Sequence, residues 1–437
     1  MTDYLAKLQA GLEPAERLNQ IVEHGMCIGC GICQSMVASL KVEVVTNGYE
    51  RPIISGPLDH QQIDRVLSVC PGTRVEGMPE HLIDEHTKLD PVWGVWHDMF
   101  LSYSAEPDVR HMASTGGLLT GIALYLLESK QIDFVLHAKA SSSNPSFGEA
   151  CISRNREQVL NAAGSRYGPT ATLKNVIQVI EQAEANEERF AFIGTPCDVS
   201  ALRNYAKLDP RVDQYCDAML TMVCGGFMAP SNMRAFLAQR GIKLDSVSSL
   251  RYRGYGCPGP TTINTTDGKE HEFTYLDFWG DDEANWGLPP RCKVCPDGIG
   301  DSADIAAADT WDGGSPTVKG SQTDLGTNAA VVRTARGLEI INSAIHAGYL
   351  IRSDSLTPAD MNRFQPHQEK KKRAAWARFE GMRSAGNIVP NSSGLRLREL
   401  HQLNSQVDNE REYEGARKRV CTGKFKEESP RVNNNET

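Results

Sequence analysis

The spacing of apolar residues changes along the chain and predicts which segments are strands and which are helices. In the middle of the chain, short apolar runs alternate with longer stretches in which apolar residues recur every three or four positions. The predicted strands lie at 99–105 and 132–140, and within 189–198 and 217–227, where each ends in a turn. The predicted helices lie at 114–130 and 175–186, after a cap at Asp198, and from Ser231. This alternation is typical of an α/β fold, in which a parallel or mixed sheet is flanked by helices.

The two ends of the chain have different patterns. Leucines near helical spacing predict one helix over residues 1–20, and residues 41–55 predict two short strands around an Asn47-Gly48 turn. A further hairpin is expected at 260–275. After residue 356 the chain becomes polar, with amphipathic helices expected at 369–383 and 395–403 and a disordered end. We therefore expect three domains, 1–95, 96–340 and 341–437.

Composition narrows the class of protein. The 437 residues are 40% hydrophobic and carry a net charge of −9, which argues against a nucleic-acid-binding protein. No signal peptide and no apolar stretch of about 18 residues is apparent, so a soluble, cytoplasmic protein without membrane or nucleic-acid partners is expected. Twelve cysteines remain to be explained, and clustered cysteines in a reducing compartment indicate metal or redox chemistry more often than disulfides.

Three of these cysteines form a C-x-x-C-x-x-C run at Cys27, Cys30 and Cys33. In bacterial ferredoxins such a run continues to a fourth cysteine followed by proline. Val37 stands at that position here, and the early cysteine that precedes a proline is Cys70. We interpret these four thiols as the ligands of one 4Fe–4S cluster, with a structural zinc ion as the alternative.

A second set is less compact. Cys292 and Cys295 form a C-x-x-C pair, while Cys197 and Cys224 each follow a predicted strand. Strand carboxyl ends gather at one edge of an α/β sheet, so these four thiols could meet there. Spacing alone also allows a zinc site, a redox pair or ordinary buried cysteines. The other cysteines carry no such pattern.

Two glycine-containing turns are candidates for ligand binding. Ser114, Thr115, Gly116 and Gly117 stand at the start of a predicted helix, where free backbone amides favour phosphate. A plain turn with a serine cap explains them equally well. In residues 164–170, Ser165, Arg166 and Tyr167 could contact a flavin or a phosphate, or belong to an exposed loop.

Taken together, these motifs resemble the coenzyme F420 hydrogenase/dehydrogenase beta-subunit family, whose wider membership includes 7-hydroxymethyl chlorophyll a reductase and divinyl chlorophyllide vinyl reductase. The matching pieces run in family order over residues 24–312: CIGCGIC, CPG, STGGLLTGIALYLLESKQID, GSRYGPT, IGTPCDVSALR, VCGGF, RCKVC and ADIAAADTW. The chain departs from the family at Ala308-Asp309, where members often have a glycine before the aspartate.

The resemblance implies a ferredoxin-like N-terminal iron–sulfur module, an FAD-binding α/β core and a helical C-terminal tail. It implies two 4Fe–4S clusters, the second held by Cys197, Cys224, Cys292 and Cys295. It also suggests self-association and the following flavin contacts: Ser114, Thr115, Gly116, Gly117, Ser165, Arg166, Tyr167, Gly194 and Thr195.

Two functions follow as hypotheses. In the first, the chain is a self-contained reductase that takes electrons from a ferredoxin-like donor and reduces a small organic substrate through FAD. The N-terminal cluster module within the same chain favours this hypothesis. In the second, the chain is an electron-transfer subunit of a larger complex that uses coenzyme F420 or ferredoxin. A non-catalytic zinc scaffold is a third interpretation. His111, Tyr167 and Asp198 are weak candidates for a proton donor, and the basic segment 369–378 for docking of an acidic partner.

Overall fold

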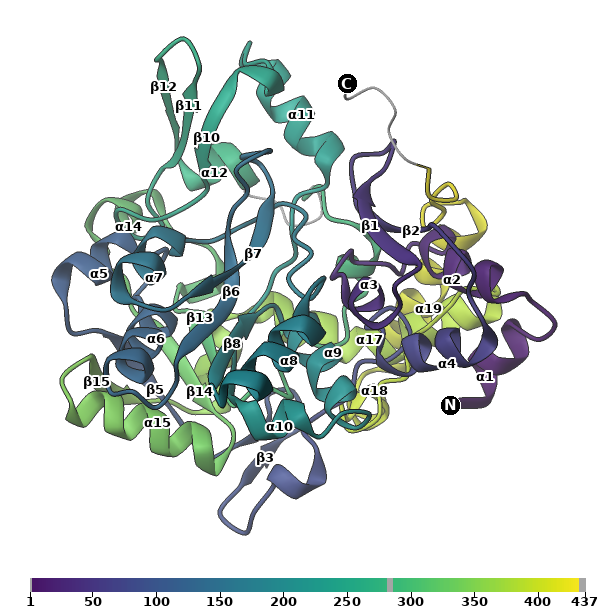
Figure 1. The fold of residues 1–437 in the computed structure, drawn as a ribbon, viewed down its shortest axis with the longest axis horizontal. Helices are drawn as coiled ribbons and strands as arrows, with labels where there is room; N and C mark the ends of the chain where they lie inside the picture. Colours follow the sequence, from purple (N-terminus) through teal and green to yellow (C-terminus); the bar gives the residue numbers. More distant parts are fainter. Residues whose placement is uncertain (1, 281–285, 432–437) are drawn as a thin grey trace.

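A mixed eight-stranded sheet forms the centre of the computed structural model, which describes residues 2–280 and 286–431 (Figure 1). The strand order is β15-β5-β14-β13-β9-β8-β6-β7. The strands are β5 (Asp98–Ser104), β6 (Phe134–Ala140), β7 (Gly148–Ser153), β8 (Phe190–Gly194), β9 (Cys216–Met222), β13 (Ile305–Asp309), β14 (Asn328–Val332) and β15 (Leu350–Ser355).

Strand direction decides where the chemistry can gather. Strands β6, β8, β9 and β13 are parallel, and β5 points the same way because β14 separates it from β13 by two antiparallel pairings. The carboxyl ends of these five strands therefore lie at one edge of the sheet. The segments that follow them carry most of the motifs described above.

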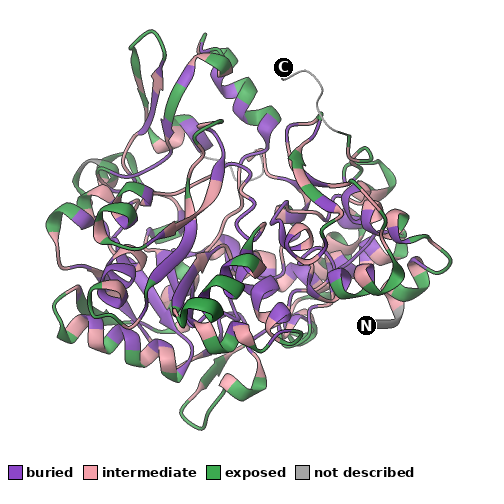
Figure 2. Cartoon of the chain, in the orientation of Figure 1, coloured by how far each residue is buried: buried purple, intermediate pink, exposed green. Residues whose placement is uncertain are grey.

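Alternate residues of the strands pack on opposite faces of the sheet. Val135, Ala191, Leu220 and Ile305 belong to one core, and their neighbours along the strands, such as Phe134 and Phe190, to others. The first face is covered by α6 (Leu118–Glu128), α7 (Arg156–Ala162) and α15 (Ala335–His346). The opposite face is covered by α8 (Val176–Asn186), α9 (Pro196–Ala206), α10 (Arg211–Tyr215) and α16 (Pro358–Phe364). Figure 2 shows the central strands buried and the outer faces of these helices exposed.

The first 70 residues and the last helices pack together on one side of the molecule (Figure 1). Their elements are α1 (Thr2–Leu8), α2 (Pro14–Glu23), α3 (Ile32–Met36), β1 (Leu40–Val44), β2 (Glu50–Ile54), α4 (His60–Val69), α17 (Pro366–Ser384), α18 (Leu397–Leu403) and α19 (Gln406–Cys421). Ile21 and Val66 share a core with Phe379 and Ala416, so the two ends of the chain stabilise each other.

A smaller antiparallel sheet lies beside the main one. It consists of β10 (Val247–Arg251), β11 (Thr261–Thr265) and β12 (Glu270–Phe273), with α11 (Pro230–Gln239) and α12 (Tyr275–Trp279) packed on it. The remaining short elements are β3 (Lys88–Asp90), β4 (Gly94–Trp96), α5 (Pro107–Met112), α13 (Pro290–Lys293) and α14 (Val318–Thr323).

The structure confirms the α/β class and the helical C-terminal segment, and corrects several details. The one helix expected over residues 1–20 is two helices in the described part, residues 2–20, because Gly11 takes a left-handed φ of 78° and Pro14 begins the second. Strand β15 pairs with β5, so the main sheet extends past the expected boundary at 341. Thr195, rather than Asp198, caps α9, with Asp198 three residues further on in the same capping box. Of the end expected to be disordered, residues 427–437, Glu427 is instead held in a buried ion pair with Arg51, and residues 432–437 lie outside the described residues.

Among the described residues, no helix is both long enough and apolar enough to cross a lipid bilayer.

Candidate functional site

The four cysteines of the first set lie around one small cavity between α3 and the end of α4. Cys27 and Cys30 lie in the loop before α3, Cys33 lies on α3, and Cys70 caps α4. We call this group the first nest. Cys70 is distant in sequence, and the packing of α4 against α2 and α3 brings it to the other three.

The backbone of the first nest is shaped by glycine. Gly29 and Gly31 take left-handed φ values of 76° and 87°. A Cβ on Gly31 would lie 2.7 Å from the side chain of Lys174, so the loop approaches the core more closely than another residue allows. The amide of Gly72 donates to the sulfur of Cys70 at 3.4 Å.

Burial governs the protonation of these thiols. Burial raises the pKa of Cys70 to about 12. It also raises the pKa of Cys27, although the guanidinium of Arg51 acts in the opposite direction. Arg51 is itself buried and forms an ion pair with Glu427 at 2.9 Å. Burial therefore favours the protonated, uncharged form of these thiols. A bound cation would be needed to keep all four as thiolates.

The second set also comes together, at the carboxyl edge of the sheet. Cys197 lies in the first turn of α9, Cys224 follows β9, Cys292 lies on α13 and Cys295 follows α13. We call this group the second nest. After burial, the main influences that raise the pKa of Cys224 to about 12 are the charges of Cys292 and Cys295, which shows how close these groups lie.

Helix α17 supports the second nest from the C-terminal part of the chain. Gln368 donates to the carbonyl of Cys224 at 2.8 Å, and Lys371 donates to the carbonyl of Gly225 at 3.1 Å. The charge of Lys371 opposes the burial that raises the pKa of Cys224 and Cys292. This role was not predicted from the sequence, because α17 contains no recognised motif and its lysines indicate a solvent-exposed basic helix.

A third group of polar residues surrounds Arg253, whose side chain is only 4% exposed. Arg253 forms an ion pair with Asp309 at 2.9 Å and donates to the carbonyl of Ser114 at 2.8 Å and to the hydroxyl of Tyr167 at 3.2 Å. Thr115 donates to Asp309. We call these five residues the arginine cluster.

The arginine cluster joins the two predicted turns. The amide of Ser165 donates to the hydroxyl of Ser114 at 2.7 Å, which brings 164–170 against 114–117. Neither Arg253 nor Asp309 was among the predicted site residues. Asp309 could have been predicted as a site residue because it ends a buried strand. Arg253 could not, because it lies in a glycine-rich loop without a motif.

Several predicted contacts lie elsewhere. The amides of Gly116 and Leu118 at the start of α6 are bonded to the side chain of Asn328, so the expected free phosphate-binding amides are occupied there. Gly194 and Thr195 lie beside the second nest, with the Thr195 hydroxyl 3.0 Å from the sulfur of Cys197. Arg166 donates to the carbonyl of Leu250 at 3.4 Å.

The three proton-donor candidates lie in different surroundings. His111 is exposed, with its ring against Tyr255. Tyr167 belongs to the arginine cluster and packs edge-on against Trp279, with ring centroids 4.9 Å apart. Asp198 is 3% exposed, and burial raises its pKa to about 6. Asp198 accepts from the hydroxyl of Thr195 at 2.8 Å and so lies beside the second nest, away from the arginine cluster.

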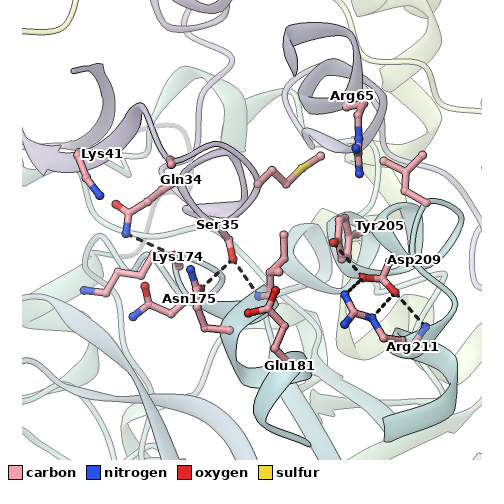
Figure 3. Close-up of a pocket in the computed structure, with 15 residues that line it drawn as sticks. Gln34, Ser35, Lys41, Arg65, Lys174, Asn175, Glu181, Tyr205, Asp209 and Arg211 are labelled. Carbon is pink, nitrogen blue, oxygen red and sulfur yellow. Dashed lines mark hydrogen bonds and ion pairs between the residues drawn. The ribbon is translucent and has the colours of Figure 1, made fainter. Parts of the chain in front are cut away.

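A surface cavity of about 550 Å³ lies between the first nest's helices and the main domain (Figure 3). Arg65 projects toward it from α4, while Asp209 is held at one side by Tyr205 and Arg211. Lys41 and Arg65 make no ion pair with any residue in the described part of the chain. The lining residues are Gln34, Ser35, Met36, Ala38, Lys41, Arg65, Lys174, Asn175, Ile177, Gln178, Glu181, Tyr205, Leu208, Asp209 and Arg211.

Comparison with known proteins places these features in a family. Residues 99–178 match the N-terminal part, and residues 187–355 the C-terminal part, of the coenzyme F420 hydrogenase/dehydrogenase beta subunit. The two matches contain the arginine cluster, the second nest and the whole main sheet apart from the first residue of β5.

Individual relatives agree with this assignment. The chain is 23% identical over 376 residues to coenzyme F420-dependent sulfite reductase of Methanocaldococcus jannaschii. This match covers 82% of the present chain but only about half, 52%, of the length of that protein. It is 26% identical over 258 residues to the coenzyme F420 hydrogenase beta subunit of Methanococcus voltae, covering 56% of this chain and 80% of that subunit.

Among solved structures, the chain is similar to one chain of the xenon-derivatised F420-reducing NiFe hydrogenase complex from Methanosarcina barkeri. The identity is 21% and the TM-score 0.49, over 65% of this chain and 91% of that chain. The two sequence matches together span more than half of the residues. The protein therefore belongs to the coenzyme F420 hydrogenase/dehydrogenase beta-subunit family of oxidoreductases.

Proposed function

We propose that this chain is an electron-transfer component that exchanges two electrons with a deazaflavin such as coenzyme F420 and single electrons with a protein partner. The observation that carries the proposal is the presence of two four-cysteine nests in a chain that also has a buried cluster of polar residues at the carboxyl edge of its main sheet. Both relatives are named for coenzyme F420. One is a subunit of a hydrogenase, and the other is a longer protein, of which the match covers 52%. They favour the subunit hypothesis over the self-contained reductase.

The donor set of each nest fits a 4Fe–4S cluster. Each nest offers four cysteines, the ligands that hold a 4Fe–4S cluster, together with cationic neighbours. At Cys70 an amide donates to sulfur, which would tune the potential of a bound cluster. A tetrahedral zinc ion with bonds of about 2.3 Å needs sulfurs within roughly 4 Å of each other. In the described residues no three His, Cys, Asp or Glu side chains are arranged to hold a single metal ion.

The arginine cluster fits the polar part of a flavin. The Nε of Arg253 is buried and makes no hydrogen bond within the described part of the chain, so it retains one donor for a ligand. Ser114, Thr115, Ser165 and Tyr167 surround it. We assign residues 96–340 to the flavin and the second nest, and residues 1–95 to a cluster-binding module.

These groups, when bound, would provide complementary chemistry, because clusters exchange single electrons whereas flavin exchanges either one or two. The chain's own residues bind and orient them. Arg253 holds the Tyr167 hydroxyl in place, so Tyr167 is our candidate for carrying a proton at the flavin. Helix α17 covers the second nest and excludes water from it.

Metal content tests the nests directly. Anaerobically purified protein is expected to contain about eight irons and one FAD per chain. Cys70→Ser and Cys224→Ser should each lose about half of the iron, because each removes one ligand from a different nest. Cys151→Ser, on β7 and outside both nests, should keep all of it. Zinc in either nest of the wild-type protein would refute the assignment.

Activity tests the reaction. The reconstituted protein should oxidise reduced coenzyme F420 with a one-electron dye as acceptor, followed by the return of the F420 absorbance. A protein that binds FAD and iron but leaves reduced F420 unchanged would refute the deazaflavin assignment. A protein that reduces an organic substrate unaided, with reduced ferredoxin, would instead support the self-contained reductase.

A further inference from the structure

The two nests share two neighbouring charged residues, one of each sign. Asp198 follows Cys197 in sequence, and its charge also acts on Cys30 of the first nest. Arg291 precedes Cys292, and its charge also acts on Cys70 of the first nest. Each of these two charges therefore acts on one cysteine of each nest.

Arg291 makes the direct connection. Its Nη2 donates to the carbonyl of Pro71 at 3.1 Å, and Pro71 follows Cys70. A single hydrogen bond thus joins the segment that holds a thiol of the first nest to the segment that holds a thiol of the second. The two residues that form this hydrogen bond are 220 positions apart in the sequence.

The surroundings of Arg291 leave its charge without an ordinary partner. The residue is 1% exposed, and its Nε makes no hydrogen bond among the described residues. Within the same residues it forms no ion pair with a carboxylate. Burying a guanidinium is unfavourable unless negative charge lies nearby. Thiolate-held groups in the two nests would supply that negative charge.

We propose that Arg291 is a shared counter-charge for both nests, which raises the reduction potentials of the two clusters together and fixes the spacing between them. The inference rests on the proposed function, because it requires a cluster in each nest. Adding an electron makes a cluster more negative, so a nearby fixed cation stabilises the reduced form. A cation between two clusters acts on both, whereas one beside a single nest acts on one.

Redox titration of the full chain, followed by electron paramagnetic resonance, tests the proposal. Arg291→Met is expected to lower both midpoint potentials, while iron and sulfide content stay at the wild-type level. Lys371→Met is the matched control, since Lys371 acts on Cys224 and Cys292 of the second nest and should lower one potential. Cys70→Ser and Cys224→Ser proteins, each lacking one cluster, assign the two potentials.

The outcomes separate this inference from the proposed function. Wild-type protein without iron would refute both. Two clusters in the wild type, with Arg291→Met changing neither potential or only that of the second nest, would refute the shared role alone. If Arg291→Met does not retain iron, Arg291→Gln replaces it, because glutamine keeps a donor for the Pro71 carbonyl but not the charge. Arg291→Lys, which keeps the charge, should leave both potentials near their wild-type values.

Discussion

Arg253 and Asp309 form a buried ion pair at the carboxyl edge of the sheet, and hydrogen bonds compensate for the burial of the guanidinium. The guanidinium makes an ion pair and hydrogen bonds to a backbone carbonyl and to hydroxyl groups, and Trp311 lies 4.8 Å from it. Its planar fork satisfies several acceptors at once, which an ammonium group cannot do. The pair can therefore position the two turns that we assign to the flavin.

Replacing this arginine by lysine should weaken flavin binding. We expect Arg253→Lys to raise the dissociation constant for FAD by on the order of 10-fold, because the single ammonium cannot hold Ser114, Tyr167 and Asp309 together. Fluorescence quenching of FAD by the apoprotein measures this. Arg352→Lys, on β15 with a surface partner in Asp98, is the control. Unchanged FAD affinity in Arg253→Lys would contradict the assignment.

Glu50 on β2 carries a buried carboxyl group, and one of its oxygens has no hydrogen-bond partner among the described residues. Burial raises its pKa to about 7, despite the charge of Lys174. Because the folded state holds the proton more tightly than the unfolded state, this group favours folding less as pH rises from 4.5 to about 7.

The substitution Glu50→Gln removes that penalty. At about pH 8 the variant should be more stable than the wild type by roughly 2 kcal/mol, and the difference should disappear near the pH at which an unfolded glutamate titrates. Denaturant unfolding at several pH values measures it. Glu43→Gln, exposed on β1, should show no such trend. A gain that is independent of pH would show that ionisation is not the cause.

At the scale of elements, α17 differs most from its sequence pattern. The three lysines at 370–372 suggest a basic surface, yet Lys372 is 2% exposed and bonded to Asp301 at 2.6 Å. Asp301 also accepts from Arg396, before α18. Lys371 lies against the second nest, and Lys370 is exposed. The helix is thus a structural brace rather than a uniform docking surface.

Breaking the buried pair should destabilise the fold. We expect Lys372→Met to lower the free energy of unfolding by about 3 kcal/mol, because Asp301 loses one of its two ion-pair partners inside the protein. Chemical denaturation measures this, with Lys370→Met as the control that should change stability by less than about 0.5 kcal/mol. Equal effects of the two substitutions would contradict the brace.

At the scale of the whole molecule, the cavity beside the first nest bears on the proposed exchange of single electrons with a protein partner. It lies on α3 and α4, the helices that hold Cys33 and Cys70 (Figure 3). Its cations Lys41 and Arg65 contrast with the net charge of −9 of the chain as a whole. Local positive charge would steer an acidic carrier toward this surface.

Charge reversal tests that surface. Lys41→Glu with Arg65→Glu should slow reduction by an acidic ferredoxin about 10-fold at low salt and flatten the salt dependence, because electrostatic steering is lost. Stopped-flow absorbance measures the rate. Reduction by dithionite should be unchanged, and Lys370→Glu should behave as the wild type. An unchanged rate with ferredoxin would remove the cavity from the electron path.

The sequence by itself predicted β5, β6, β8 and β9 of the main sheet, the helices α6, α8, α9 and α11, and the two cysteine motifs, because apolar periodicity and short cysteine spacings are local properties. Only the tertiary structure decided which distant groups meet. Cys70 reaches the first nest through the packing of α4, Arg253 joins two turns more than 80 residues before it, and α17 supports the second nest from beyond the family's matched region. These contacts depend on long-range packing and on the direction of neighbouring strands, which no local pattern encodes.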